Sequence, residues 1–221
     1  MFEKGFCIEE GVFSADECDG ILSALANSNG SRSRAGVRNL MSSPIIAAVA
    51  YDDRLIGLTE RISRSRLVPF KATLFEKTGK ANWLVSWHQD TALPLERYTS
   101  SKEWGPSSVK QGINFVHAPT WALAKIIALR IQLDPSTADN GPLRVVAGSH
   151  RKRLQMDVEF ARVLADGKEV VCMTGRGGVI AMSPLILHAS SKADNDEPRR
   201  VLHIEYAESL DLAPGIRLSV A

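Results

Sequence analysis

The feature that most constrains the fold of this chain is a series of short strand-like segments after residue 66. They are rich in β-branched and aromatic residues, are separated by Gly, Pro, Asn and Asp turn signals, and lie at 71–77, 82–90, 126–134, 142–148, 170–173, 178–182, 185–190 and 200–207. No helical pattern of about 10 to 15 residues recurs between them, as a parallel βαβ sheet would require. The pattern predicts a mainly β fold, a double-sheet jelly roll or barrel, over about residues 67–207.

The segment before these strands is expected to be helical. Ser14 and Glu17 form a capping box, and Ile21, Leu22 and Leu25 follow at helical spacing, which predicts a helix over about 15–27. Residues 44–64 have the apolar spacing of one or two further helices. A chain of 221 residues suits one hydrophobic core. We therefore expect a single domain, 1–221, whose helical part (about 1–66) packs on one sheet of the β core.

Composition argues against several classes of protein. Hydrophobic residues make up 44% and charged residues 24% of the chain, as in ordinary globular proteins. Lys and Arg number 27 against 25 Asp and Glu, so no nucleic-acid partner is implied. Glu3, Glu9 and Glu10 stand where a secretory signal would need a cationic start and an apolar core, and no apolar stretch reaches about 20 residues, so we expect neither a secretory signal nor a membrane span. Its three cysteines are widely spaced without a CxxC pair. We expect a cytoplasmic protein with free thiols and no membrane partner.

Two candidate metal ligands stand at the end of a predicted strand. Because side chains alternate along a strand, His88 and Asp90 share one face and Gln89 points away. Two imidazoles and one carboxylate on one face of an octahedral ion leave three positions for a bidentate cosubstrate and O2. The third ligand would be His188, which ends an apolar run 100 residues after His88. A His-x-Asp motif alone is a weak signal, so the assignment depends on its context.

That context is a second group of residues downstream of His188. Ser190 follows it by two residues and Arg199 by eleven, beyond a polar turn. A guanidinium presents a planar fork that binds a carboxylate through two hydrogen bonds, and a neighbouring hydroxyl can donate another. The spacing predicts an anchor for an acid group, and the distal carboxylate of 2-oxoglutarate is the natural ligand.

Three motifs in this order resemble the phytanoyl-CoA dioxygenase family of Fe(II)/2-oxoglutarate oxygenases. They are His88-Gln89-Asp90, the segment LDPSTADNGPLRVVAGSH, and HAS followed by PRRVLHIEY, and the resemblance covers about residues 70–207. It implies a double-stranded β-helix (a cupin-like jelly roll) with Fe(II) at its mouth. One departure is Gly177-Gly178, where the family usually has Gly-Asp.

The resemblance also implies roles for individual residues. The iron ligands would be His88, Asp90 and His188, and Arg199 with Ser190 would hold 2-oxoglutarate. Trp104 resembles a tryptophan that lines the cosubstrate pocket, and Gln89 is included as a cofactor-binding candidate. Since related halogenases have a small residue at the position of Asp90, its presence implies hydroxylation, with release of succinate and CO2.

Four further residues are candidates for substrate binding. Arg130 and Gln132 alternate with apolar neighbours, so one face of their strand is polar and either lines the pocket or faces solvent; the same two readings apply to Asn82 and Lys77. Residues 91–122 read as a long irregular insertion, and such loops are commonly functional. The substrate would be a small polar or anionic metabolite, acted on with O2 by a monomer or homodimer.

Other interpretations stay open at this point. His203 and Glu205 form a competing His-x-Glu pair, whose structural reading is a hydrogen-bonded pair. His150 is expected to fix a loop, Arg200 to form an ion pair opposite Arg199, and Trp83, Val85 and Trp87 to pack in the core. The alternative functions are a catalytically inactive jelly-roll binding protein and a metal-dependent cupin enzyme that does not use 2-oxoglutarate.

Overall fold

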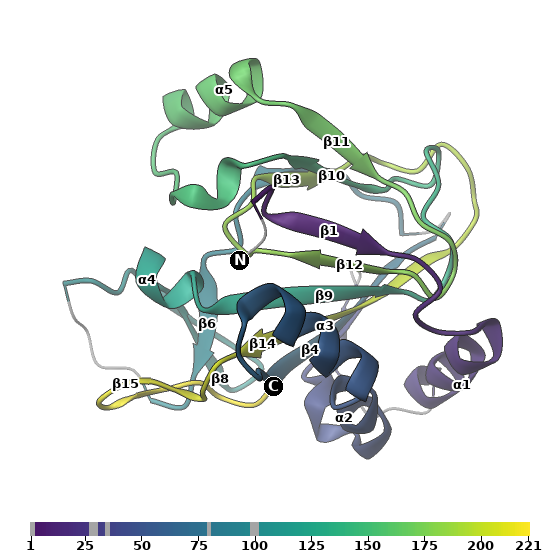
Figure 1. The fold of residues 1–221 in the computed structure, drawn as a ribbon, viewed down its shortest axis with the longest axis horizontal. Helices are drawn as coiled ribbons and strands as arrows, with labels where there is room; N and C mark the ends of the chain where they lie inside the picture. The colour runs from purple at the N-terminus through teal and green to yellow at the C-terminus, as the bar shows by residue number, and fades with distance from the viewer. Residues whose placement is uncertain (1–2, 27–30, 34–35, 79–80, 98–101) are drawn as a thin grey trace.

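The computed structural model describes residues 3–26, 31–33, 36–78, 81–97 and 102–221, and two antiparallel sheets form its centre (Figure 1). The large sheet has the strand order β1 (Phe6–Glu9), β12 (Val179–Met182), β9 (Ile126–Gln132), β14 (Arg199–Ala207), β4 (Val68–Lys77), β3 (Gly36–Arg38) and β2 (Ser31–Ser33). The small sheet has the order β11 (Glu169–Cys172), β10 (Leu143–Val146), β13 (His188–Ser190) and β5 (Val85–His88). Each of the eight predicted strand segments lies in one of these two sheets.

The large sheet buries both of its faces. On β9, Leu129 and Ile131 pack in the cluster shared with the N-terminal helices, whereas Ala128 packs toward the small sheet. Arg130 and Gln132 share the face of Ala128 and are only 8% and 1% exposed. The polar face of this strand therefore lies in the interior and not in solvent. Polar groups in such a place need partners or a ligand.

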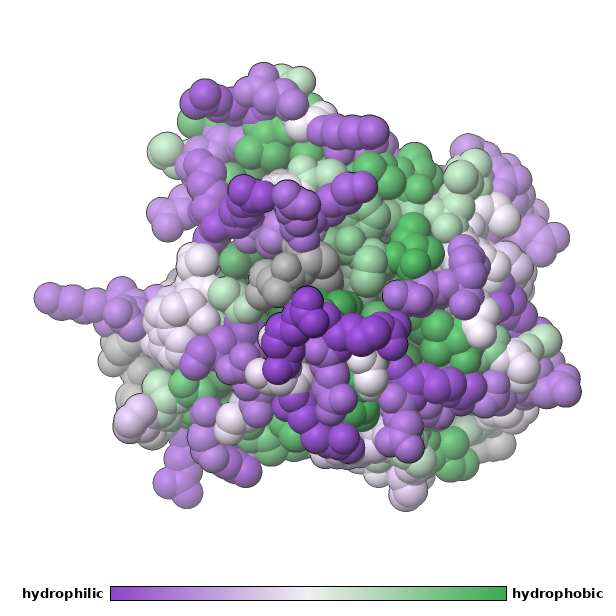
Figure 2. All heavy atoms as spheres, in the orientation of Figure 1, coloured by the Kyte–Doolittle hydropathy of each residue, from purple (hydrophilic) through white to green (hydrophobic). Residues whose placement is uncertain are grey.

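Three helices cover the outer face of the large sheet, as predicted (Figure 1): α1 (Ala15–Ala26), α2 (Pro44–Ala50) and α3 (Asp53–Ser63). The capping box at the start of α1 is present, since the Ser14 N–H donates to Glu17 Oε2 at 2.7 Å and the Glu17 N–H to Ser14 Oγ at 3.2 Å. The Tyr206 hydroxyl donates to Ala50 O at 2.8 Å and joins β14 to α2. Hydrophilic side chains cover the outward side of α3 (Figure 2). Within the described residues, no helix has both the length and the apolar character that spanning a bilayer requires.

Residues 91–122 differ from the predicted irregular insertion. They form a three-stranded sheet, with the order β6 (Ala92–Leu95), β8 (Ile113–His117) and β7 (Ser107–Lys110), followed by the short helix α4 (Thr120–Leu123). Strands β7 and β8 are joined by Gln111 and Gly112, both at positive φ (53° and 80°), as a tight hairpin turn requires. The prediction failed because β7 is exposed along its whole length and shows no apolar alternation.

The remaining elements lie at the periphery. They are the helix α5 (Asp157–Asp166), the 3-10 turns η1 (Leu40–Ser42) and η2 (Ser149–Arg151), and the hairpin β15 (Asp211–Ala213) and β16 (Ile216–Arg217). Helix α5 was not predicted, and none of its residues is buried. It lies beyond β11, at the edge of the molecule away from the N-terminal helices (Figure 1).

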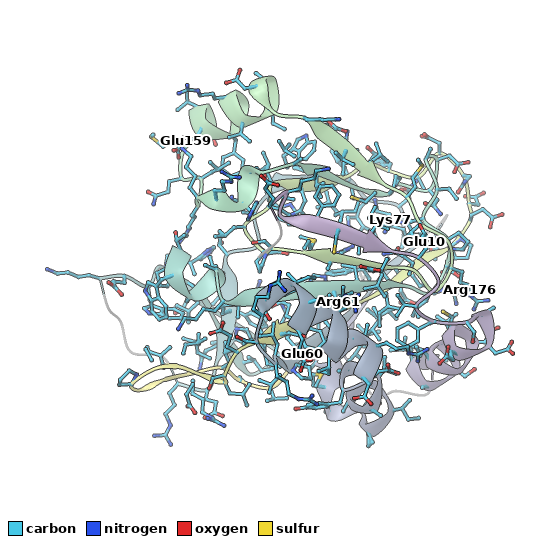
Figure 3. The ribbon with its side chains drawn as sticks, viewed as in Figure 1. Glu10, Glu60, Arg61, Lys77, Glu159 and Arg176 are labelled. Atoms are coloured by element: carbon cyan, nitrogen blue, oxygen red, sulfur yellow. The ribbon has the colours of Figure 1, made fainter. Side chains whose placement is uncertain are left out.

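Polar contacts join the N-terminal segment to the loop before β12. Glu10 Oε2 accepts hydrogen bonds from Thr174 Oγ1 at 2.6 Å and the Gly175 N–H at 3.1 Å. Arg176 pairs with Asp19 of α1 at 2.6 Å. Figure 3 labels Glu10 and Arg176, which lie at the same end of the sheets. The adjoining residue is Gly177, which has φ of 79°.

We expect Gly177→Ala to lower the free energy of unfolding by at least about 2 kcal/mol. A Cβ at this position would lie 1.9 Å from the carbonyl oxygen of Phe13, whose N–H donates to Gly177 O at 3.0 Å. Urea unfolding followed by circular dichroism measures the change. Gly20→Ala in α1 is the control, because nothing lies within 4 Å of its added Cβ and alanine favours helix by up to about 1 kcal/mol. Equal stability of the Gly177→Ala variant and wild type would contradict the packing described here.

Candidate metal centre

The pairing of β5 with β13 brings two histidines together. His88 lies directly opposite His188 in the antiparallel register, and their ring centroids are 4.2 Å apart. Asp90 follows β5, and its N–H donates to Pro184 O at 2.9 Å, which holds the chain beside the turn that leads into β13. Strand pairing thus joins residues 100 positions apart, as the sequence predicted.

Both imidazoles are oriented by the backbone of their own strands. The Nδ1 atom of His88 lies 2.8 Å from Ser86 O, and that of His188 lies 2.8 Å from Ile186 O. A carbonyl can only accept, so Nδ1 carries the proton in each ring and Nε2 keeps its lone pair. The two Nε2 atoms lie 3.7 and 3.6 Å from the carboxylate oxygens of Asp90. All three ligand atoms fall within 4.8 Å of one another, which fits bonds of about 2.0–2.2 Å to one metal ion.

The protonation states suit metal binding. Burial is the main cause that lowers the pKa of His188 to about 4, so its ring is neutral near pH 7. Partial burial raises the pKa of Asp90, but His188, His203, His88 and Lys71 outweigh it and lower that pKa to about 2. A neutral imidazole and an ionised carboxylate are the forms that bind a divalent cation.

An inner cavity of about 130 Å³ extends from this triad between the sheets. Its lining residues are Phe75, Lys77, Trp83, Val85, His88, Asp90, Arg130, Leu143, His188, Ala189, Ser190 and Arg199. The end away from the metal is cationic, because Lys77 and Arg199 are direct partners in the β4–β14 register. Both are almost fully buried, at 2% and 5% exposure.

Ser190 connects the two cations. Its Oγ accepts from Lys77 Nζ at 2.7 Å and from Arg199 Nη2 at 3.3 Å, and donates to Gly141 O at 2.7 Å. Burial first, then Arg199 and Arg130, lower the pKa of Lys77 to about 8. Burial and Arg130 hold the pKa of Arg199 below its usual value. Two buried cations without a carboxylate between them form a site for an acid group.

Arg130 provides a third cation in the inner cavity, beside the metal triad. Its Nη1 donates to His203 Nδ1 at 3.1 Å, while its buried Nε has no hydrogen-bond partner. Among the described lining residues Asp90 is the one acid, and it is a metal ligand. A buried donor without a partner is costly unless a ligand supplies the acceptor. The cavity therefore fits an elongated dianion with one acid group at Arg199 and the other near the metal and Arg130.

An outer cavity of about 370 Å³ lies on another side of the triad. It shares Phe75, His88 and Asp90 with the inner cavity. Its other lining residues are Arg38, Asn39, Lys71, Thr73, Gln89, Thr91, Ala92, Lys110 and Phe115. These three cations, Arg38, Lys71 and Lys110, could not be found from the sequence, because they lie on three strands of two sheets and belong to no motif.

Three of the predicted binding residues do not line the inner cavity. Gln89 Nε2 donates to Lys152 O at 2.9 Å and to Leu185 O at 2.5 Å, and its Oε1 accepts from the Leu154 N–H at 2.7 Å. Its side chain therefore joins the segments that hold these residues to the end of β5. Asn82 exchanges two hydrogen bonds with the backbone of Ala193, at 2.8 and 2.7 Å. Trp104 packs edge-on against Trp121, 6.1 Å between centroids, in a separate apolar cluster and not in the inner cavity.

The other placements refine the predictions. Gln132 donates to Arg130 O at 3.2 Å behind the inner cavity and does not line it. Arg130 and Lys77 do line it, and Lys77 lies directly opposite Arg199 in the strand register. Trp83 and Val85 also line this cavity, so the prediction that they pack in the core was wrong. The β5–β13 register shifts between His188 and Ser190, which changes the alternation that the prediction assumed.

The competing histidine pair has a structural role. His203 Nε2 donates to Glu205 Oε1 at 3.3 Å, and Lys71 pairs with the same oxygen at 2.6 Å. Within the described residues, the group able to hold a metal is His88, Asp90 and His188. The side chain of Arg200 points to the other face of β14 from that of Arg199. Its guanidinium donates two hydrogen bonds of 2.7 Å to Asp134, as predicted.

Comparisons with known proteins agree with this centre. Three solved structures share the fold: EctD from S. alaskensis with bound Fe (20% identity over 98% of this chain and 75% of that chain, TM-score 0.71), SnoK, a non-heme alpha ketoglutarate dependent carbocyclase from nogalamycin biosynthesis (16%, 94% and 81%, 0.70), and HygX from Streptomyces hygroscopicus with iron bound (17%, 93% and 82%, 0.64). No curated protein sequence matches the chain. The family model described as Phytanoyl-CoA dioxygenase (PhyH) matches residues 1–201. The chain therefore belongs to the phytanoyl-CoA dioxygenase family of non-haem Fe(II)/2-oxoglutarate-dependent oxygenases.

Proposed function

We propose that the protein hydroxylates a small-molecule metabolite with Fe(II), 2-oxoglutarate and O2, releasing succinate and CO2. One observation carries this proposal. A two-histidine, one-carboxylate triad stands at one end of a buried cavity whose other end holds Lys77 and Arg199. A metal-dependent cupin that does not use 2-oxoglutarate would have no use for that second, cationic end.

The residues of the inner cavity match 2-oxoglutarate group by group. The distal carboxylate would accept from Arg199, Lys77 and the hydroxyl of Ser190, which can turn from Gly141 O toward the ligand. Phe75 and Leu143 offer apolar surface to the two methylene groups. The Nε atom of Arg130 would donate to the keto acid end. A cosubstrate held at both ends would have its keto acid end fixed beside His88, Asp90 and His188, the residues that would hold the metal.

His88, Asp90 and His188 would serve as metal ligands and not as acid–base catalysts. Bound Fe(II) with 2-oxoglutarate supplies the oxidative chemistry by which O2 is reduced and a substrate C–H bond is hydroxylated. The backbone bonds at both Nδ1 atoms keep the rings in place during this cycle. Asp90 offers a carboxylate ligand where, by the family resemblance, halogenases have a small residue, which supports hydroxylation over halogenation.

Succinate release tests this function. Reduced, metal-loaded protein is incubated with 2-oxoglutarate, O2 and a panel of small metabolites, and succinate and hydroxylated product are measured together. We expect equal amounts of succinate and hydroxylated product with at least one metabolite, and slow succinate release when no metabolite is added. A protein that binds metal and 2-oxoglutarate yet forms no succinate under any condition would instead be a binding protein.

The affinity for 2-oxoglutarate is expected to fall on the order of tenfold between pH 8 and 9.5. Lys77 has a pKa of about 8 in the free protein, so above this pH binding of the carboxylate requires the uptake of a proton. The stability of the free protein changes in the opposite direction. The pKa of Lys77 is about 8 in the folded protein and 10.5 in the unfolded chain. The free energy of unfolding therefore rises with pH between these two values. Calorimetric titration in Lys77→Met is the control, and an unchanged pH dependence in this variant would contradict the assignment.

A further inference from the structure

We infer that the substrate carries an acid group, a carboxylate or a phosphate, which Arg38 and Lys110 bind at the far side of the outer cavity. This inference rests on the proposed function and adds the chemical class of its substrate. The outer cavity is lined by His88 and Asp90 of the metal triad, so a molecule bound in it would lie beside the residues that would hold the metal. The inner cavity is left to the cosubstrate.

The charge of the outer cavity favours an anion. Its described lining has three cations, Arg38, Lys71 and Lys110, and one acid, Asp90, which is a metal ligand. Lys71 already pairs with Glu205 at 2.6 Å. Arg38 and Lys110 therefore leave the lining with an excess of positive charge. A cationic substrate would be repelled there, whereas an acid group would gain charge-assisted hydrogen bonds.

The two cations come from opposite walls that contact each other. Arg38 ends β3 of the large sheet, and Lys110 ends β7 of the three-stranded sheet. The residues that follow Arg38 and Lys110 contact each other, since Asn39 Nδ2 donates a hydrogen bond to Gln111 Oε1 at 3.1 Å. Both residues have positive φ, 60° for Asn39 and 53° for Gln111, so the backbone at each of these two positions is left-handed.

The ammonium groups of Lys110 and Lys71 lie near the aromatic ring of Phe115, which lines the outer cavity. Lys110 Nζ lies 5.4 Å and Lys71 Nζ 5.7 Å from the centroid of the Phe115 ring, within cation–π distance. The volume of about 370 Å³ is at the small end of the range for ligand pockets. The site thus fits a compact metabolite, with its acid group at Arg38 and Lys110 and its body over Phe115 toward the metal.

The test measures anion binding close to the metal without a known substrate. The protein is loaded with Mn(II) in place of iron and saturated with 2-oxoglutarate, which occupies the inner cavity. Inorganic phosphate is the probe, and the paramagnetic relaxation of its phosphorus nucleus reports binding near Mn(II). We expect a saturable enhancement in wild type. Arg38→Gln and Lys110→Met should each weaken phosphate binding at least several-fold, and together at least tenfold.

Lys125→Met is the matched control, because Lys125 Nζ also lies over an aromatic ring, 5.6 Å from the centroid of Trp121, but outside the cavity. It should bind phosphate as wild type does. No saturable enhancement in wild type, or full enhancement in the double variant, would overturn the inference. Water proton relaxation reports Mn(II) binding separately, so a protein that fails to bind Mn(II) contradicts the proposed function itself.

Discussion

Replacing Asp90 with alanine is expected to abolish turnover and to weaken Fe(II) binding at least about a hundredfold. Asp90 is the one carboxylate of the triad, and both histidine Nε2 atoms face it at 3.7 and 3.6 Å. Without it the ion keeps two neutral ligands and loses the negative charge that offsets its own. The Asp90 side chain is 42% exposed, so the variant should remain folded. Metal content after anaerobic loading and succinate release measure the two effects.

His150→Ala is the control for a general effect of losing a polar side chain. The His150 ring lies against Gly5, since a Cβ on Gly5 would come within 2.3 Å of it, and it is not among the grouped metal ligands. The His150→Ala variant should have a lower free energy of unfolding than wild type. It should keep its bound iron and its activity per folded molecule. Full turnover in Asp90→Ala, or equal loss of iron in both variants, would contradict the assigned triad.

The second large effect is expected for Arg199→Gln, which should weaken 2-oxoglutarate binding about a hundredfold or more. Charge-assisted hydrogen bonds contribute about 1.5 to 3 kcal/mol each, and the fork of Arg199 can make two. The loss should not come from misfolding, because Arg199 lies among cations, and its removal relieves repulsion with Lys77 and Arg130. Titration of the Mn(II)-loaded protein with 2-oxoglutarate gives the affinity, and thermal unfolding gives the stability.

Arg200→Gln is the matched control, since the two arginines are adjacent and face opposite ways. Arg200 makes three hydrogen bonds to Asp134, from its N–H, Nε and Nη2. Its loss should lower stability and leave the affinity for 2-oxoglutarate within about twofold. If Arg200→Gln impaired 2-oxoglutarate binding and Arg199→Gln did not, the orientation of β14 described here would be wrong.

The metal triad could be predicted because it follows from local rules. The period of two along a strand puts His88 and Asp90 on one face, and the apolar run before His188 places it at a strand end. The same rule separated Arg199 from Arg200. It failed at Trp83 and Val85, where the register between β5 and β13 shifts and brings both into the inner cavity. A bulge inserts an extra residue into one strand, and the alternation of apolar and polar residues alone does not predict where this happens.

The outer cavity could not be predicted, because its walls come from distant parts of the chain. Arg38 lies on a strand of three residues and Lys110 on a fully exposed one, and neither strand has an apolar pattern. Trp104 was expected in the cosubstrate pocket from the resemblance alone. It packs instead edge-on against Trp121, in an apolar cluster that includes Leu93 and Val116 of the three-stranded sheet, and is only 6% exposed. Strand pairing between remote segments decides such positions, and no single segment contains that information.

The most direct test of the proposed function is anaerobic. Fe(II) and 2-oxoglutarate are added to metal-free protein, and the weak visible charge-transfer band of the chelate is recorded for wild type and Arg199→Gln. A band that saturates at one equivalent of iron in wild type, and that needs far more 2-oxoglutarate in the variant, is the predicted result. A correctly folded wild-type protein that forms no band would contradict the assignment of His88, Asp90, His188 and Arg199 to one oxygenase centre.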